Sequence, residues 1–120
     1  MSLRVKVDSL TYPVADDSEV SVRIVIGDAQ AGGWIVAWDK DHVVAKGEDP
    51  DLISIGKGKD VRNRTLQIRA TAVDVRADTN RLSSTLTVDG GTEGAKKLVH
   101  RYDDGDAGDA ALFATAVRFT

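Results

Sequence analysis

Strict alternation of apolar and polar side chains constrains the fold of this chain more than any other feature, and it is clearest over residues 64–88. Apolar residues occupy every second position from 66 to 72, with polar residues between them. A period of two is typical of a β-strand that buries one face and exposes the other. The period returns at residues 82–88, after a segment at 77–80 whose Asp and Asn favour a turn. The stretch predicts two long strands joined as a hairpin.

The same alternation marks strands along the rest of the chain. We predict further strands over residues 3–7, 20–26, 34–38, 42–46, 52–55, 97–102 and 111–119. The strands at 34–38 and 42–46 are close enough to pair as a hairpin, and residues 56–60 are expected to form a loop. No segment shows the helical period of about 3.6 residues. The sequence therefore predicts an all-β fold, an antiparallel β-sandwich, with a closed β-barrel as the alternative.

Length and composition narrow the class of protein. A chain of 120 residues, 42% of them hydrophobic, is predicted to fold as one domain over residues 1–120. The formal net charge of −3 argues against a nucleic-acid partner, which a basic surface would favour. The absence of cysteine excludes disulfides and thiolate chemistry. Since there is neither a long apolar run nor a signal-peptide pattern, we expect no membrane partner and a cytoplasmic location, or secretion if a leader has been removed.

The residues that usually carry catalysis form no recognisable motif. Neither His42 nor His100 accompanies a nucleophile motif such as Gly-x-Ser-x-Gly. His100 shares the parity of Leu98 and Tyr102, which favours a half-buried structural role. The sequence predicts that the protein is not an enzyme.

The segment at residues 103–109 is the strongest candidate for a metal site. Its carboxylates come from Asp103, Asp104, Asp106 and Asp109. Ca²⁺ takes about six to eight oxygen ligands, and a loop rich in Asp and Gly can supply several of them. The segment matches neither the EF-hand spacing nor a repeated calcium motif. A calcium site therefore stands as a hypothesis beside a plain solvated acidic loop, and no other cofactor is predicted.

Two tryptophans, Trp34 and Trp38, lie on one face of their predicted strand and are candidates for ligand binding. An exposed indole offers a flat face on which a sugar ring can stack. The competing interpretation places them in the core, because β-sandwiches often bury a tryptophan on the third strand. The core interpretation is favoured, with at most one of the two indoles exposed.

Three segments carry a resemblance to known domains. They are Gly-Gly-Trp-Ile-Val-Ala-Trp-Asp at 32–39, Thr-Leu-Gln-Ile-Arg-Ala-Thr-Ala-Val-Asp-Val at 65–75 and Asp-Gly-Gly at 89–91. Together they resemble the pattern of bacterial immunoglobulin-like or fibronectin-like sandwich domains. The resemblance implies that type of sandwich, without the paired cysteines of antibody domains, and it implies no functional residues.

These observations predict a non-enzymatic module that works by protein contact, either with a partner or through self-association. Strand-rich domains without a catalytic motif commonly act through their loops and sheet edges. The alternative is a calcium-assisted module that binds carbohydrate or another ligand, with the acidic segment holding the ion and a tryptophan as the platform.

Overall fold

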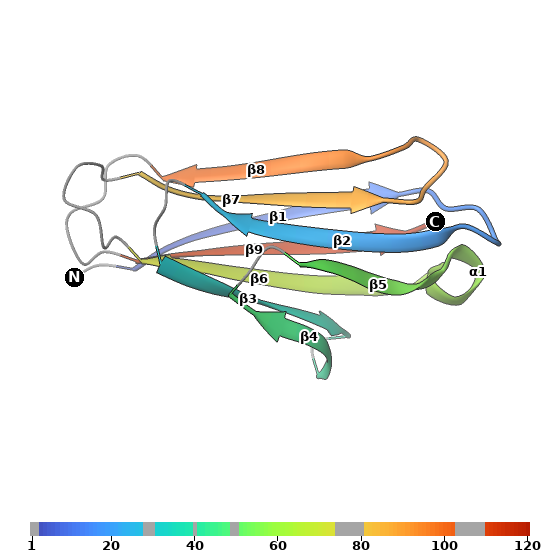
Figure 1. The fold of residues 1–120 in the computed structure, drawn as a ribbon, viewed down its shortest axis with the longest axis horizontal. Coiled ribbons are helices and arrows are strands. Elements are labelled where there is room, and N and C mark those ends of the chain that lie inside the picture. The colour runs from blue at the N-terminus through green and yellow to red at the C-terminus, as the bar shows by residue number, and fades with distance from the viewer. Residues whose placement is uncertain (1–2, 28–30, 40, 49–50, 74–80, 103–109) are drawn as a thin grey trace.

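The computed structural model describes residues 3–27, 31–39, 41–48, 51–73, 81–102 and 110–120. Strands dominate these residues and run along the long axis of the molecule (Figure 1). The described elements are β1 (Leu3–Tyr12), β2 (Glu19–Ile26), β3 (Ala31–Trp38), β4 (His42–Gly47), β5 (Leu52–Lys57), α1 (Gly58–Val61), β6 (Thr65–Val73), β7 (Leu82–Asp89), β8 (Lys96–Tyr102) and β9 (Ala110–Phe119).

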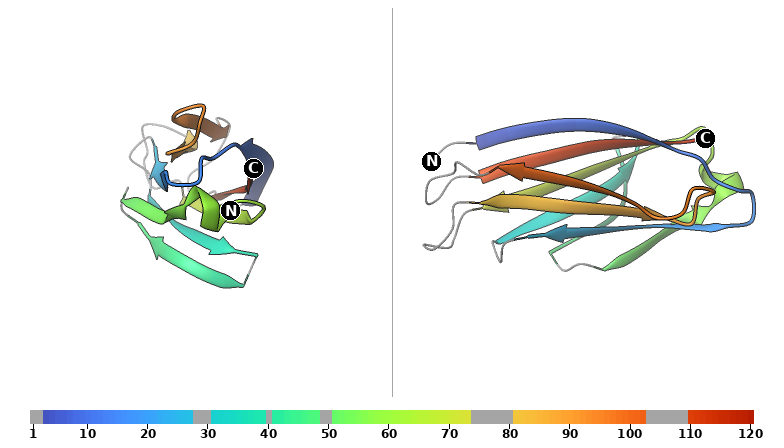
Figure 2. Two further views of the ribbon diagram at one scale, coloured as in Figure 1. Left: turned by 90° about the vertical axis from the view of Figure 1, so that its right-hand side faces the viewer. Right: turned by 90° about the horizontal axis from the view of Figure 1, so that it is seen from above.

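The strands form two stacked sheets (Figure 1, Figure 2). The five-stranded sheet has the order β1-β9-β6-β3-β4, and the four-stranded sheet has the order β5-β2-β7-β8. Neighbouring strands are antiparallel, except that β1 runs parallel to β9. The two sheets do not close into a barrel. The all-β class is confirmed, and the arrangement is that of a β-sandwich.

The predicted hairpin over residues 64–88 is wrong in its pairing, although both of its strands exist. β6 pairs with β3 and β9 in one sheet, whereas β7 pairs with β2 and β8 in the other. Alternation shows that a strand has one buried face but does not name its neighbour. The chain also leaves β6 at Val73 and enters β7 at Leu82, a longer connection than the roughly two to five residues of a tight hairpin.

Other predictions about strands and faces are confirmed. β3 and β4 pair as an antiparallel hairpin, with a register shift between Val36 and Ala37. In β9 the buried side chains include Phe113, Val117 and Phe119, at alternate positions as the parity predicts. Together with the inward residues of β2, β3, β6 and β7 they form one apolar core between the sheets.

Residues 56–60 contain a short helix where a loop was expected. The four residues of α1 follow β5 directly, and the Gly58 N–H donates to the carbonyl of Ser18 at 2.9 Å. The buried side chain of Val61 anchors this turn to the core. A single helical turn is too short to leave a periodic signal in the sequence. Among the residues that the structure describes, no helix is long and apolar enough to cross a membrane.

Tyr12 fastens the end of β1 to the turn between β7 and β8. Its ring is fully buried, and its hydroxyl donates to the carbonyl of Gly94 at 2.6 Å and accepts from the N–H of Gly91 at 2.9 Å. Burial raises the pKa of the phenol above its ordinary value of 10.0, against the smaller lowering effect of the Gly91 N–H. The hydroxyl is therefore held in its neutral, donating form.

We expect Tyr12→Phe to lower the free energy of unfolding by about 1–3 kcal/mol at neutral pH, because it removes one donor and one acceptor from partly buried groups. Since the folded pKa is raised, the hydroxyl's contribution is complete below pH 10 and is lost as pH rises through the folded pKa. Urea unfolding of both proteins at neutral and strongly alkaline pH measures this difference. A difference that grows with pH would contradict the assignment.

Candidate functional site

The first feature of the candidate site is the orientation of β1, whose apolar side chains face solvent. Val5 is 55% exposed and Val7 is 77% exposed on the outer face of the five-stranded sheet. The charged residues Arg4, Lys6 and Asp8 alternate with these valines. They therefore lie on the same side of the strand as the buried Tyr12. The alternation of this strand is visible in the sequence, but the structure turns its apolar side outward.

The charged side of β1 lies along β8. These two strands are edge strands of the two sheets, so their contacts join the sheets along one side of the sandwich. The Nε of Arg4 donates to the hydroxyl of Tyr102 at 2.9 Å, and the Nζ of Lys6 donates to the carbonyl of Arg101. Asp8 Oδ2 lies 3.6 Å from Nε2 of His100. These contacts give the charged groups of an edge strand polar partners, while Arg4, Lys6 and Asp8 remain exposed to solvent.

His100 is the buried member of this flank, as its parity predicted. Its ring stacks on that of Phe113, with centroids 5.7 Å apart and planes at 6°. Its Nε2 has no hydrogen-bond partner among the described residues. The other histidine, His42, is exposed at the start of β4, opposite Trp38 in the ladder.

The apolar surface of β1 continues onto β9, and the exposed polar residues Arg69 and Thr71 of β6 separate it from the apolar residues of β3 and β4. In the β1–β9 register Val5 lies beside Leu112 and Val7 beside Ala114. Farther along the same face, Ile35 on β3 is 43% exposed and Val43 on β4 is 55% exposed. We call the outward side of β1-β9-β6-β3-β4 the outer face; its apolar members include Val5, Val7, Ile35, Val43, Leu112 and Ala114.

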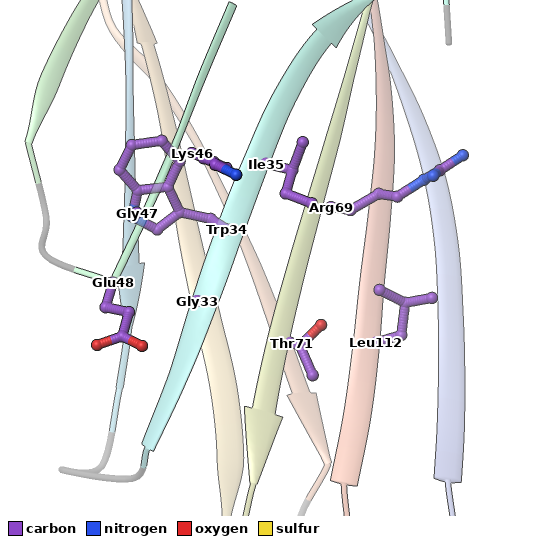
Figure 3. Close-up of a pocket in the computed structure, with 9 residues that line it drawn as sticks. All are labelled: Gly33, Trp34, Ile35, Lys46, Gly47, Glu48, Arg69, Thr71 and Leu112. Atoms are coloured by element: carbon purple, nitrogen blue, oxygen red, sulfur yellow. The ribbon is translucent and has the colours of Figure 1, made fainter. Parts of the chain in front are cut away.

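A groove of about 560 Å³ crosses the outer face (Figure 3). Gly33, which shares the outward parity of Ile35, contributes only backbone where another residue would place a side chain, so the surface is hollow at this position of β3. Ile35 and Leu112 supply apolar contact area. Lys46 and Arg69 are both opposite Ile35 in the strand register, so two cations flank one apolar side chain.

Both tryptophans predicted as ligand-binding residues belong to the core. Trp34 is 4% exposed and Trp38 is 5% exposed, so neither presents an indole face to solvent. The guanidinium of Arg64 covers Trp38, with Cζ 4.1 Å from the ring centroid. Trp34 nevertheless lines the groove, where its ring lies against Gly47. A role of the tryptophans in ligand binding stays a prediction. Because both rings are buried, only Trp34, which lines the groove, remains a candidate.

The predicted calcium ligands Asp103, Asp104, Asp106 and Asp109 lie outside the described residues, so the calcium hypothesis stays a prediction. Within the described ranges, no group of three or more His, Asp or Glu side chains is arranged to hold a metal ion.

The sequence pattern did not single out the outer face or its groove. The groove residues are distant in the chain, and one of them, Gly33, acts by lacking a side chain. Comparisons with protein-family models, with curated proteins and with solved structures found no match to this chain. The geometry of the site therefore carries the functional argument.

Proposed function

We propose that this protein is a non-enzymatic protein-interaction module and that its contact surface is the outer face. The inverted orientation of β1 supports this proposal most strongly. Edge strands commonly carry charge where they meet solvent, which discourages unwanted association. Here the valines face solvent, and the charged residues of the strand are used against β8.

Burial of this surface by a partner would recover a hydrophobic contribution that the isolated chain forgoes. Each large aliphatic side chain moved from solvent to an interface contributes about 1.5–3 kcal/mol when fully buried. Exposed apolar patches beside polar residues, such as the one on β1 and β9, mark interaction sites on many proteins. Polar groups on the same face, such as Gln67 on β6 and Arg118 on β9, would set the orientation of the partner.

The immunoglobulin-like or fibronectin-like character remains part of the proposal. A buried tryptophan on the third strand supports it. The strand order differs, however, because β6 lies between β3 and β9, a position that the penultimate strand occupies in immunoglobulin domains. We therefore rest the functional proposal on the outer face and not on this likeness.

The double substitution Val5→Thr and Val7→Thr tests the proposed surface. Threonine has a similar shape and a high strand propensity, so the sheet should persist while the surface becomes polar. We expect affinity for a partner to fall by about tenfold or more, since two apolar contacts are lost. The measurement uses each variant as bait in an extract of the source cells, followed by titration of the purified partner.

Val25→Thr with Val99→Thr is the matched control, because these valines are 36% and 54% exposed on the four-stranded sheet. The control should bind like the unaltered protein. Equal losses in both variants, or a protein that stays monomeric and binds no partner, would contradict the proposal. Sedimentation of the protein alone shows whether a second copy is the partner.

A further inference from the structure

We propose that the groove on the outer face binds an extended acidic segment of a partner protein, with an apolar side chain in the groove and carboxylates on Lys46 and Arg69. This inference rests on the proposed function, since it assigns part of the partner to one part of the contact surface. Three observations carry it: the direction of the groove, its apolar lining and its charge.

The groove runs across the strands. Its lining comes from β4, β3, β6 and β9, which are successive neighbours in the sheet. Adjacent strands are about 4.8 Å apart, so the groove covers about 14 Å. An extended chain advances about 3.3–3.6 Å per residue, so a segment of about four residues spans it. An extended segment therefore matches this shape.

The lining is suited to one apolar side chain. Gly33 is outward-facing beside Ile35, and it is opposite Thr71, which in turn is opposite Leu112. The missing side chain at position 33 leaves a hollow bordered by Ile35 and Thr71, with Leu112 on the far side of Thr71. Leucine or a similar side chain of the partner would gain apolar contact with Ile35 and Leu112.

The charge of the groove favours carboxylates. Figure 3 shows Ile35 between Lys46 and Arg69, in agreement with the strand register. The ion pairs formed within the described residues, Arg62–Asp16 and Lys96–Glu93, include neither cation. Among the lining residues that the structure describes, Lys46 and Arg69 outnumber the one acid, Glu48, so this part of the groove is cationic on a chain whose net charge is −3.

The same charge disfavours a second copy of this chain as the occupant. Packing of groove against groove would bring Lys46 and Arg69 of one copy toward the same cations of the other. Like charges placed opposite each other weaken an interface. An acidic segment instead gives both cations a partner, and its apolar residue fills the hollow.

The test uses three synthetic peptides and amide chemical shifts of the ¹⁵N-labelled protein. The peptides are acetyl-Gly-Asp-Gly-Leu-Gly-Asp-Gly-amide, whose Asp and Leu side chains share one face of an extended chain, a version with Lys in place of Asp, and a version with Ser in place of Leu. We expect the first peptide alone to shift amides of residues 33–35, 46–48 and 69–71 in a saturable manner. Added salt should weaken this binding, because exposed charge pairs are screened.

Lys46→Gln with Arg69→Gln should weaken binding of the Leu-Asp peptide by about tenfold, since two charge pairs are lost. The control is Lys97→Gln with Arg101→Gln, which removes the same charge from exposed positions on β8. The control should leave the affinity within about twofold. Circular dichroism and melting curves confirm that both variants remain folded.

Several outcomes overturn the inference. They are the absence of saturable shifts at millimolar peptide, shifts outside the groove, equal losses in the two variants, and equal binding of decanoate, which would indicate a small amphipathic ligand. Dimerisation through the groove, strengthened by removal of its cations, would identify a second copy as the occupant. If the valine variants lose a partner that Lys46→Gln with Arg69→Gln retains, the interaction surface stands and only the groove assignment fails.

Discussion

Gly90→Ala is expected to reduce the free energy of unfolding by about 3–5 kcal/mol, because it combines a strained backbone with a steric overlap. Gly90 follows β7 and has a φ of +96°, a conformation that residues with a Cβ rarely adopt. A Cβ at this position would lie 2.0 Å from the carbonyl oxygen of Glu19 and 2.9 Å from its carbonyl carbon. Both atoms are backbone at the start of β2, so a side-chain rotation cannot relieve the contact.

Gly94→Ala separates the cost of backbone strain from the cost of steric overlap. Gly94 lies in the same connection between β7 and β8 and has a φ of +77°, but no atom lies within 4 Å of an added Cβ. We expect this variant to lose only about 1–2 kcal/mol. Urea unfolding followed by tryptophan fluorescence measures both. Equal losses would show that backbone conformation alone, and not the approach to Glu19, makes Gly90 necessary.

Much of the fold could be predicted because alternation acts locally. The inward set in β9, which includes Phe113 and Phe119, is visible from the sequence since side chains of a strand alternate between faces. The same reasoning placed His100 on a buried parity. The hairpin of β3 and β4 could also be predicted, because its strands are separated by only a few residues.

Strand pairing between distant segments could not be predicted in this way. β6 and β7 both present one apolar face, and each could have joined the other in a single sheet. The choice of β3 and β9 as neighbours of β6 depends on side-chain packing across the whole core. A single sequence specifies the neighbours of a strand only through the way in which all strands pack together.

The orientation of β1 shows a second limit. Alternation at residues 3–7 defines two faces but assigns neither of them to the core, and apolar residues inside would be the usual expectation. The decisive contacts, such as Arg4 with Tyr102 and Asp8 with His100, join segments at opposite ends of the chain. The candidate site depends on this reversal, so it became visible only with the tertiary structure.

Phe119→Ala is expected to lower the free energy of unfolding by about 3–5 kcal/mol, because it leaves a cavity in the core. The Phe119 ring is fully buried and packs edge-on against Tyr12 at a centroid distance of 6.3 Å and against Trp38 at 6.0 Å. Its backbone also joins the segment before β6, since its carbonyl accepts from Asn63 and its N–H donates to Arg64. The side chain therefore connects β1, β3 and β9.

The loss should lie near the upper end of that range because the surroundings are poorly able to collapse into the cavity. Tyr12 is held by its bonds to Gly91 and Gly94, and Trp38 is covered by Arg64. Val7→Ala is the control: its side chain is 77% exposed, so we expect a change within about 0.5 kcal/mol. Urea unfolding checks both. A loss at Phe119 as small as that at Val7 would mean that the three strands do not depend on this ring for their packing.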